Sequence, residues 1–339
     1  MSSVVSTHQV RLETVDEASD GQRLDNFLAK ICRGVPKSHL YQLIRSGQVR
    51  VNKGRAQADT RLALGDAVRI PPIRTRDKPA SADSPMRQRS LADLGGQLPV
   101  VHEDDSILVI DKPPGTAAHG GSGVSSGVIE RLRATRPEAR FLELAHRLDR
   151  DTSGLLMLAK TRPALRRLHD LLRSHKVQKR YVAICLGKVP KRQKTIRLPL
   201  SRIERPGGDR AVVVDAAGKS ALTEVTGLAS EQRRSIGMLS LVSVRLETGR
   251  THQIRVHLAA NDFPLLGDSR YGRFDINRRA AQQGFARMYL HARDLVFPHP
   301  VLGHRMSLRS DWPASFAALF DEPDDDSHRH AWTSHEENK

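Results

Sequence analysis

The chain has 339 residues, with 55 Lys and Arg against 38 Asp and Glu, so its net charge is +17. This length can bury a full core and predicts two domains, and the positive charge predicts a polyanionic partner. No apolar run approaches the roughly 20 residues that span a bilayer, and Met1–Gln9 lacks the apolar segment of a secretory signal. These features argue against a membrane-spanning protein and predict a soluble, cytoplasmic one.

Residues 1–15 are polar and are predicted to be flexible, and a compact unit is predicted over residues 16–75. Its first helix is indicated by apolar residues at i, i+3, i+4 and i+7, namely Leu24, Phe27, Leu28 and Ile31. After a break at Pro36, Ser38 is predicted to cap a second helix and Gly47 to end it. The inner face of this helix is predicted to consist of Leu40, Leu43 and Ile44.

Short strands are predicted after the two helices. Val49 and Val51 alternate, Lys53-Gly54 is predicted to turn, and Val68 and Ile70 alternate again. Two short helices followed by a small set of strands resemble the S4 RNA-binding domain. The resemblance extends through Arg23-Leu24-Asp25, Ser38, Gly47, Val49, Val51-Asn52 and Gly65-Asp66. It implies a small α/β domain that binds RNA.

The charge of this segment supports that interpretation. Residues 21–70 carry ten Lys or Arg and three Asp, a net charge of +7. Cations at the predicted helix ends and turn can reach phosphates, which give affinity and register but little sequence information. The RNA contacts predicted here are Lys37, Ser38, Arg45, Arg50, Lys53 and Arg55. A solvated face of an accessory domain is the alternative.

The composition changes twice beyond this unit. Residues 76–98 combine Pro, Ser and mixed charges, which is typical of a linker, and a second, larger domain is expected over residues 99–320. Residues 321–339 are rich in Asp, Glu and His, poor in apolar residues, and predicted to be a disordered tail. Solvation, rather than metal binding, is expected for the tail histidines His328, His330 and His335.

The stretch from His146 to Leu155 places one carboxylate, Asp149, between basic residues and ahead of a turn at Asp151–Gly154. The apolar run Leu155–Ala159 behind the turn predicts a short buried strand. Asp149 is therefore expected on a loop that a rigid element holds, which is a common place for a reactive side chain. The same residues also fit an ordinary charged surface loop.

Four sequence blocks, taken together, are more specific than any one of them. In order along the chain, Ile107–Gly115, His146–Gly154, Lys179–Ala183 and Gly249–Leu258, the last followed by Leu266–Asp268, resemble motifs of the RluA family of RNA pseudouridine synthases. The closest resemblance is to its RluC-like branch, which acts on large-subunit ribosomal RNA. The resemblance covers nearly all of residues 15–320 and implies an α+β fold whose larger domain is a mixed, largely antiparallel sheet with flanking helices.

This resemblance implies a cofactor-free isomerase that converts uridines of 23S ribosomal RNA to pseudouridine. The reaction breaks the bond from uracil N1 to ribose C1′ and makes one from C5, so it needs neither redox chemistry nor an external group. The sequence shows no phosphate loop, dinucleotide fingerprint or metal-ligand cluster. Asp149 corresponds to the catalytic aspartate of the family. Attack on C1′, attack on the base and a glycal route all remain open for this carboxylate.

By the same resemblance, Arg255 is the partner that favours the charged form of Asp149, placed on a helix by Ile254 and Leu258. Tyr181 is the active-site tyrosine of the family, whose ring can stack on uracil and whose hydroxyl can exchange a proton. We expect Tyr181 to begin a strand with Val182, Ile184 and Leu186 on its inner face. A structural salt bridge for Arg255 and simple sheet packing for Tyr181 are the alternatives.

A uridine stacked in RNA must be flipped out to reach a buried carboxylate. The resemblance implies that Arg147 fills the vacated space, because a planar guanidinium suits stacking and phosphate contact. Two more residues are predicted to contact RNA. His146 begins the block that contains Asp149, and Arg250 lies near the start of the block Gly249–Leu258. A structural role for His146 is the alternative.

No metal site is predicted. Cys32 and Cys185 are far apart, and His252 and His257 are spaced i, i+5, so that they lie on different faces of a helix. Asp268 and Arg270, near Gly267 and Gly272, are interpreted as turn residues without a chemical role.

Two other function classes fit parts of the sequence. A non-catalytic RNA-binding or ribosome-assembly protein needs only the basic S4-like unit, and the set Asp149, Tyr181 and Arg255 argues against it. A nucleoside or base-excision hydrolase also uses a carboxylate and base flipping, but it releases free uracil. The expected partners are large-subunit ribosomal RNA or ribosome assembly intermediates, and the expected state is a monomer.

Overall fold

The structure is a computed structural model that describes residues 4–6, 9–16, 19–32, 34–76, 93, 98–120, 126–204 and 210–323. It contains two compact units. The first comprises the described residues before position 98 together with residues 130–143 and 159–163, and the second comprises the other described residues. Most of the expected linker 76–98 and tail 321–339, including His328, His330 and His335, lies outside the described residues. The expected domain boundaries therefore stay predictions.

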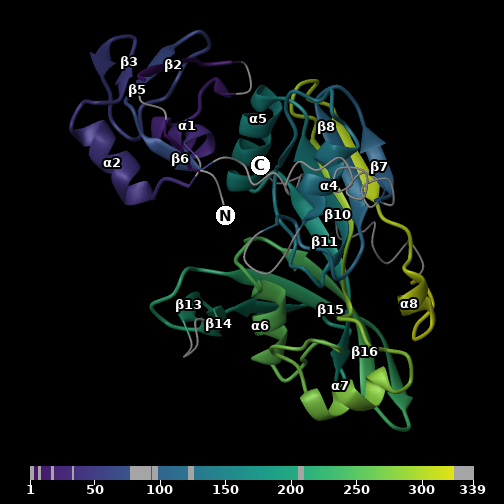
Figure 1. Cartoon of the computed structure of the whole chain (residues 1–339). Coiled ribbons are helices and arrows are strands. Elements are labelled where there is room, and N and C mark those ends of the chain that lie inside the picture. Colours follow the sequence, from purple (N-terminus) through teal and green to yellow (C-terminus); the bar gives the residue numbers. More distant parts are fainter. Residues whose placement is uncertain are drawn as a thin grey trace. The chain divides into compact units, whose positions relative to one another are not determined.

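The first unit contains two short helices and a four-stranded sheet in the order β2-β5-β3-β4 (Figure 1). Its elements are α1 Leu24–Ile31, α2 Lys37–Arg45, β2 Arg11–Thr14, β3 Arg50–Val51, β4 Gly54–Arg55 and β5 Ala67–Ile70, and β1 Val4–Ser6 pairs separately with β6 Arg74–Arg76. The predicted inner faces of both helices pack in one apolar core with Val49, Val68 and Ile70, with Ile31 partly buried at its edge. The two-helix and strand arrangement predicted for this segment is thus confirmed.

Gly47 ends α2 as predicted. Its φ is +71°, and its N–H donates to the carbonyl of Ile44 while the N–H of Gln48 donates to that of Leu43. The prediction for Ser38 is wrong, because α2 begins at Lys37 directly after Pro36 and Ser38 lies exposed in the first helical turn. Proline is favoured just ahead of a helix for its fixed φ, and no side chain caps this end.

Two strand predictions for the first unit also need correction. The turn between β3 and β4 is formed by Asn52 and Lys53, with φ of 49° and 69°, and not by Lys53-Gly54. Asn tolerates this left-handed conformation. Residues 11–14, expected to be flexible, form β2 against β5. The half-buried side chains of β2, Arg11 and Glu13, are charged and pair with each other, so no apolar alternation marks the strand.

The second unit is built on a ten-stranded sheet in the order β12-β15-β16-β11-β17-β10-β8-β7, with β18 on β17 and β9 on β10 (Figure 1). Its strands are β7 Val100–Glu103, β8 Ile107–Lys112, β9 Glu143–Leu144, β10 Ser153–Ala159, β11 Gln178–Leu186, β12 Lys194–Arg197, β15 Leu222–Arg233, β16 Gly237–Leu246, β17 Leu290–Pro298 and β18 Arg305–Arg309. β10 and β17 are parallel, whereas β11, β15 and β16 pair with their neighbours in antiparallel fashion. The expected mixed, largely antiparallel sheet is confirmed.

A hairpin and several helices complete the description. They are β13 Leu200–Glu204 with β14 Arg210–Val214, and α4 Val128–Ala134, α5 Arg162–Arg173, α6 Gln253–Ala259, α7 Phe274–Ala281 and α8 Ala314–Ala317. Helix α6 contacts β14 and β15 and lies beside the β15–β16 part of the sheet in Figure 1. Ile254 and Leu258 are buried on α6, which confirms the predicted inner face. Among the described helices, none combines the length and hydropathy needed to cross a bilayer.

Strand β11 begins at Gln178, so the prediction that Tyr181 begins this strand is wrong by three residues. Val182, Ile184 and Leu186 pack in an apolar core as expected. Tyr181, Ala183 and Cys185, on the other face, are buried as well. Because both faces of β11 are covered, its sequence lacks the polar alternation that would mark its first residue.

Strand β10 is buried along its whole length, as the run Leu155–Ala159 predicts. The loop that carries Asp149 leads directly into it. At Gly154 the φ is +106°, and a Cβ added there would lie 2.2 Å from the carbonyl oxygen of Ala292 on β17. Only glycine allows the parallel strand β17 to approach this closely behind the loop.

Replacing Gly154 with Ala is therefore expected to lower the free energy of unfolding by roughly 3 kcal/mol, because both φ and the backbone contact become strained. Urea denaturation measures the change. Gly237→Ala is the matched control, since Gly237 has a φ of +102° and no atom within 4 Å of an added Cβ. It should cost about 1 kcal/mol. Equal losses for the two variants would contradict the packing argument.

Candidate active site

A cavity of about 510 Å³ in the second unit brings together residues from three of the sequence blocks. The loop before β10 contributes His146, Arg147 and Asp149, and β11 contributes Lys179 and Tyr181. The segment from Leu246 to Arg255, which runs from the end of β16 into α6, lines much of the remaining wall. The tertiary structure thus joins residues that lie about a hundred positions apart in the chain.

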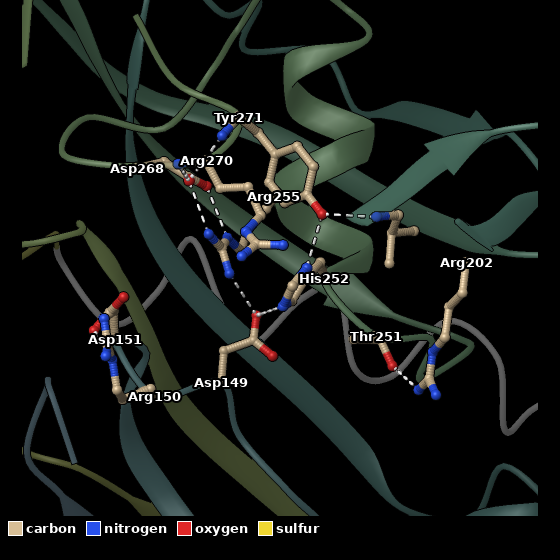
Figure 2. A network of polar contacts seen from close by, with 11 residues as sticks. Asp149, Arg150, Asp151, Arg202, Thr251, His252, Arg255, Asp268, Arg270 and Tyr271 are labelled. Atoms are coloured by element: carbon tan, nitrogen blue, oxygen red, sulfur yellow. Dashed lines mark hydrogen bonds and ion pairs between the residues drawn. The ribbon is translucent and has the colours of Figure 1, made fainter. Parts of the chain in front are cut away.

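Asp149 and Arg255 form the predicted ion pair, with Nη1 of Arg255 at 3.2 Å from Oδ2 of Asp149 (Figure 2). The side chain of Arg255 is 6% exposed and that of Asp149 is 17% exposed, so the carboxylate remains accessible from the cavity. A buried guanidinium at this distance attracts the carboxylate and fixes its orientation. The pair is present in the structure, and its catalytic role stays a prediction.

Asp268 holds the other side of the same guanidinium. Its two oxygens accept hydrogen bonds from Nε and Nη2 of Arg255, each at 2.8 Å, and the backbone N–H groups of Arg270 and Tyr271 also donate to Oδ1. Burial opposes the charge of Arg255, but the hydrogen bonds and charges of Asp268 and Asp149 outweigh it and raise the pKa of Arg255. Arg255 is thereby locked in place and points Nη1 at Asp149.

Sequence reasoning missed this role of Asp268, which we interpreted as a turn residue. It does shape the turn, through the N–H groups of Arg270 and Tyr271, but its side chain is also the main anchor of Arg255. The block Leu266–Asp268 pointed to the position without indicating a partner. The thirteen-residue separation between Arg255 and Asp268 follows no helical or strand period, so spacing could not reveal the contact.

Two further residues missed in the sequence, His252 and Tyr271, lie beside this network (Figure 2). Nε2 of His252 is 3.8 Å from Oδ2 of Asp149, and Nδ1 of His252 is 2.8 Å from the hydroxyl of Tyr271. The guanidinium of Arg255 lies over the ring of Tyr271 at 5.1 Å from its centroid. His252 therefore faces the carboxylate itself, and Tyr271 contacts both His252 and Arg255.

Tyr181 lines the cavity and is 6% exposed. Burial, and then the negative charge of Asp149, raise the pKa of its phenol well above the usual range, so the hydroxyl is protonated at neutral pH. A neutral phenol beside the carboxylate can donate a hydrogen bond or present its ring to a flat base. Its position fits the predicted role, which stays a prediction.

Two side chains, the buried Lys112 and the partly buried His146, hold the loop that carries Asp149. The ammonium group of Lys112, which is fully buried, donates to the carbonyls of Pro113, Thr116 and Arg150 at 2.9, 2.9 and 3.0 Å. Burial lowers the pKa of Lys112 to about 7, against the opposing charges of Asp151 and Asp149. The hydrogen bond from Lys112 to the carbonyl of Arg150 connects the loop to the end of β8. The sequence block Ile107–Gly115 predicted a strand and a turn, but it did not predict this contact.

His146 makes a contact that fits the structural role considered as the alternative to RNA binding. Its Nε2 accepts a hydrogen bond from the N–H of Met157 on β10 at 3.0 Å. Burial, and then the charge of Lys179, lower the pKa of His146 to about 3, so the ring is neutral. This contact positions the loop. An additional contact of His146 with RNA stays a prediction.

The remaining predicted RNA contacts fall into two sets, one in each unit. Arg147 and Arg250 are exposed at the cavity. In the first unit, exposed side chains lie at the ends of α2 and on the β3–β4 hairpin, namely Lys37, Ser38, Arg45, Arg50, Lys53 and Arg55. Their contacts with RNA stay predictions.

His252, directly before α6, and His257, within α6, contact different groups. Nε2 of His257 donates to the carbonyl of Leu198 at 2.9 Å, whereas His252 faces Tyr271 and Asp149. Over the residues that the structure describes, no cluster of three or more His, Cys, Asp or Glu side chains has a geometry suited to a metal ion.

Comparisons with known proteins point in the same direction as the geometry. The family model described as RNA pseudouridylate synthase matches residues 106–260, and the S4 domain model matches residues 22–68. The chain is 46% identical over 308 residues to "Ribosomal large subunit pseudouridine synthase C" of Salmonella typhimurium, covering 90% of this chain and 93% of that protein. It is 47% identical over 301 residues to the protein of the same name from Escherichia coli, covering 88% and 91%.

A solved structure shares the fold. "Human RNA Pseudouridylate Synthase Domain Containing 1" aligns with a TM-score of 0.58 at 24% sequence identity, covering 70% of this chain and 95% of the human chain. At this identity the likeness shows the fold alone.

Proposed function

The chain belongs to the RNA pseudouridylate synthase family, and we propose that its substrate is large-subunit ribosomal RNA. As a member of that family it isomerises uridine to pseudouridine. The names of the bacterial relatives, together with the S4 domain, support the choice of RNA. We further expect a cytoplasmic monomer that needs no cofactor.

One observation supports the catalytic part of the proposal most directly. Asp149 is oriented at the cavity by Arg255, whose guanidinium is locked by Asp268. Isomerisation breaks the N1–C1′ bond and forms the C5–C1′ bond, with one proton lost from C5 and one gained at N1. An oriented carboxylate can attack an electrophilic carbon or stabilise positive charge on the sugar. Attack on C1′, attack on the base and the glycal route all fit this arrangement.

The neighbouring side chains suit the handling of a flipped nucleotide. Arg147 is exposed at the mouth of the cavity, where its guanidinium can occupy the space that the uridine leaves in the RNA stack. Tyr181 is positioned to meet the base inside, with a protonated hydroxyl. These roles belong to the proposal.

The experiment that tests the function is release of tritium from C5-labelled uridine in unmodified large-subunit RNA, with free uracil measured in parallel. Tritium release without free uracil is the expected result, because the C5 proton is lost while the base stays attached. Free uracil would instead indicate a hydrolase. RNA binding without tritium release, on both naked RNA and assembly intermediates, would indicate a binding protein.

The S4 domain is expected to add phosphate contacts. Replacing Lys37, Arg45 and Lys53, all exposed, with Gln should reduce the slope of log affinity against log salt by about 2, at roughly 0.7 for each phosphate contact with single-stranded RNA. Filter binding over a range of salt concentrations measures the slope. Arg234, Arg278 and Arg279, exposed in the second unit, provide a control triple substitution to Gln. Similar slopes for the two triple variants would argue against a specific role for the S4 cations.

A further inference from the structure

A line of polar contacts links hairpin strand β14 to Asp149 through His252 and Tyr271 (Figure 2). The backbone N–H of Val212 on β14 donates to the hydroxyl oxygen of Tyr271 at 3.0 Å. That hydroxyl lies 2.8 Å from Nδ1 of His252, and Nε2 of His252 lies 3.8 Å from Oδ2 of Asp149.

The direction of the Val212 contact favours one tautomer of His252. A backbone N–H can only donate, so the oxygen of Tyr271 accepts from Val212 and its own proton is available for Nδ1 of His252. When the hydroxyl of Tyr271 donates to Nδ1, the neutral ring carries its proton on Nε2, the atom that faces Asp149. Burial lowers the pKa of His252, against the opposing charge of Asp149, in agreement with a neutral ring at neutral pH.

The backbone holds both side chains in place. His252 has a φ of 54° at the residue before α6, and the side chain of Arg202 on β13 donates to the hydroxyl of its neighbour Thr251. The N–H of Tyr271 donates to Asp268 at 3.0 Å. The rings of His252 and Tyr271 meet edge to face, with centroids 5.5 Å apart. The hairpin and the Asp268 turn therefore both hold the pair His252 and Tyr271 in place.

Within the part of the chain that the structure describes, side chains approach the carboxylate of Asp149 at Oδ2. Nη1 of Arg255 and Nε2 of His252 both face Oδ2, at 3.2 and 3.8 Å. Among the described residues, no hydrogen bond or ion pair joins Oδ1 to another side chain. A separation of 3.8 Å exceeds a hydrogen bond, but contacts of this kind often tighten only when substrate is bound.

We propose that His252, oriented by Tyr271, is a positioning residue that donates from Nε2 to Oδ2 of Asp149 when a nucleotide occupies the cavity. Arg255 and His252 then hold Oδ2 from two directions, and Oδ1 is left for the reacting atoms. The hairpin β13–β14 contributes to this orientation through the N–H of Val212. The inference rests on the proposed function. It adds His252 and Tyr271 to the predicted site residues Asp149, Tyr181 and Arg255.

The test compares single-turnover rates of tritium release from labelled large-subunit RNA, with RNA affinity and thermal melting measured for each variant. Tyr271→Phe removes the hydroxyl and keeps the ring, so the rate should fall about fivefold to tenfold, the size expected for one neutral hydrogen bond. Affinity should change little, whereas the melting temperature should fall by roughly 2–6 °C, because the N–H of Val212 loses its acceptor. Tyr289→Phe, which removes a hydroxyl from the apolar core outside the cavity, is the matched control.

Two amides at position 252 separate positioning from a merely structural role. Gln places an N–H where Nε2 lies, whereas Asn places one where Nδ1 lies, so His252→Gln should react at least fivefold faster than His252→Asn. The left-handed backbone at position 252 favours Asn, so a structural role predicts the opposite order.

Three results overturn the inference. If Tyr271→Phe reacts as fast as the native chain and Tyr289→Phe, His252 needs no orientation by Tyr271. If His252→Asn matches or exceeds His252→Gln, a donor at Nε2 is not used. In both cases the native chain is active and the proposed function survives. If the native chain itself releases no tritium, the proposed function fails and the inference fails with it.

Discussion

Replacing Asp149 with Asn is expected to reduce pseudouridine formation by at least roughly a thousandfold while RNA affinity stays within about twofold. Asn has the same shape but cannot carry the charge, attack a carbon or stabilise a cationic sugar. Its amide also places neutral atoms opposite Nη1 of Arg255 and Nε2 of His252, which face a carboxylate oxygen in the native chain. Single-turnover tritium release and filter binding on the same RNA measure the two effects separately.

The matched control is Asp151→Asn, two residues further along the same loop. Asp151 pairs with the exposed Arg150 at 3.1 Å, and its side chain is 31% exposed. Its substitution should change the rate by less than about threefold, because exposed ion pairs contribute little energy. An Asp149→Asn variant that retained a tenth of the native rate would remove Asp149 from the chemical step.

Replacing Asp268 with Ala is expected to lower the free energy of unfolding by about 3–5 kcal/mol. The change leaves the guanidinium of Arg255, 6% exposed, without its two hydrogen bonds at 2.8 Å, and it removes the acceptor for the N–H groups of Arg270 and Tyr271. Both partners are buried, so solvent screens the loss little. Urea denaturation measures the stability. The reaction rate should fall as well, because Nη1 of Arg255 is no longer held toward Asp149.

Asp275→Ala provides the control for this variant. Asp275 pairs with Arg273 and Arg279 at 3.5 and 3.6 Å, but its side chain is 59% exposed, so the loss should be about 0.5 kcal/mol or less.

The difference in free energy of unfolding between the native chain and the Asp268→Ala variant should also depend on pH. Burial opposes ionisation of Asp268, but the hydrogen bonds and charge of Arg255 outweigh it and lower the pKa. The stabilisation is therefore present above the ordinary carboxyl pKa of about 4 and is lost as the pH falls through the lower folded value.

A second substitution can distinguish a lost ion pair from a general packing defect. If the cost of Asp268→Ala comes from an unpaired buried charge, the double variant Asp268→Leu with Arg255→Met should be more stable than Asp268→Ala alone. Equal losses for Asp268→Ala and Asp275→Ala would show that Arg255 does not depend on Asp268 for its burial.

The local features that the sequence predicted well are those encoded within a few residues. The apolar spacing of Leu24, Phe27 and Leu28 produced α1, the continuous run Leu155–Ala159 produced a buried strand, and Gly47 ended α2 with a positive φ. The predictions were wrong where a strand forms because of its pairing and packing with neighbouring elements. The charged side chains of β2 and the doubly covered strand β11 have no pattern that a single segment could show.

By itself, the sequence determined the basic character of the chain, and it predicted the order of two domains and the site residues Asp149, Tyr181 and Arg255, because motif blocks and charge are properties of the linear chain. Only the tertiary structure decided which partners meet at Asp149. Asp268 on a turn, Tyr271 after it and Val212 on β14 come together through pairing of distant strands and packing of α6. Hydrogen bonds act over about 3 Å, and that proximity is created by the fold and not by any spacing along the chain.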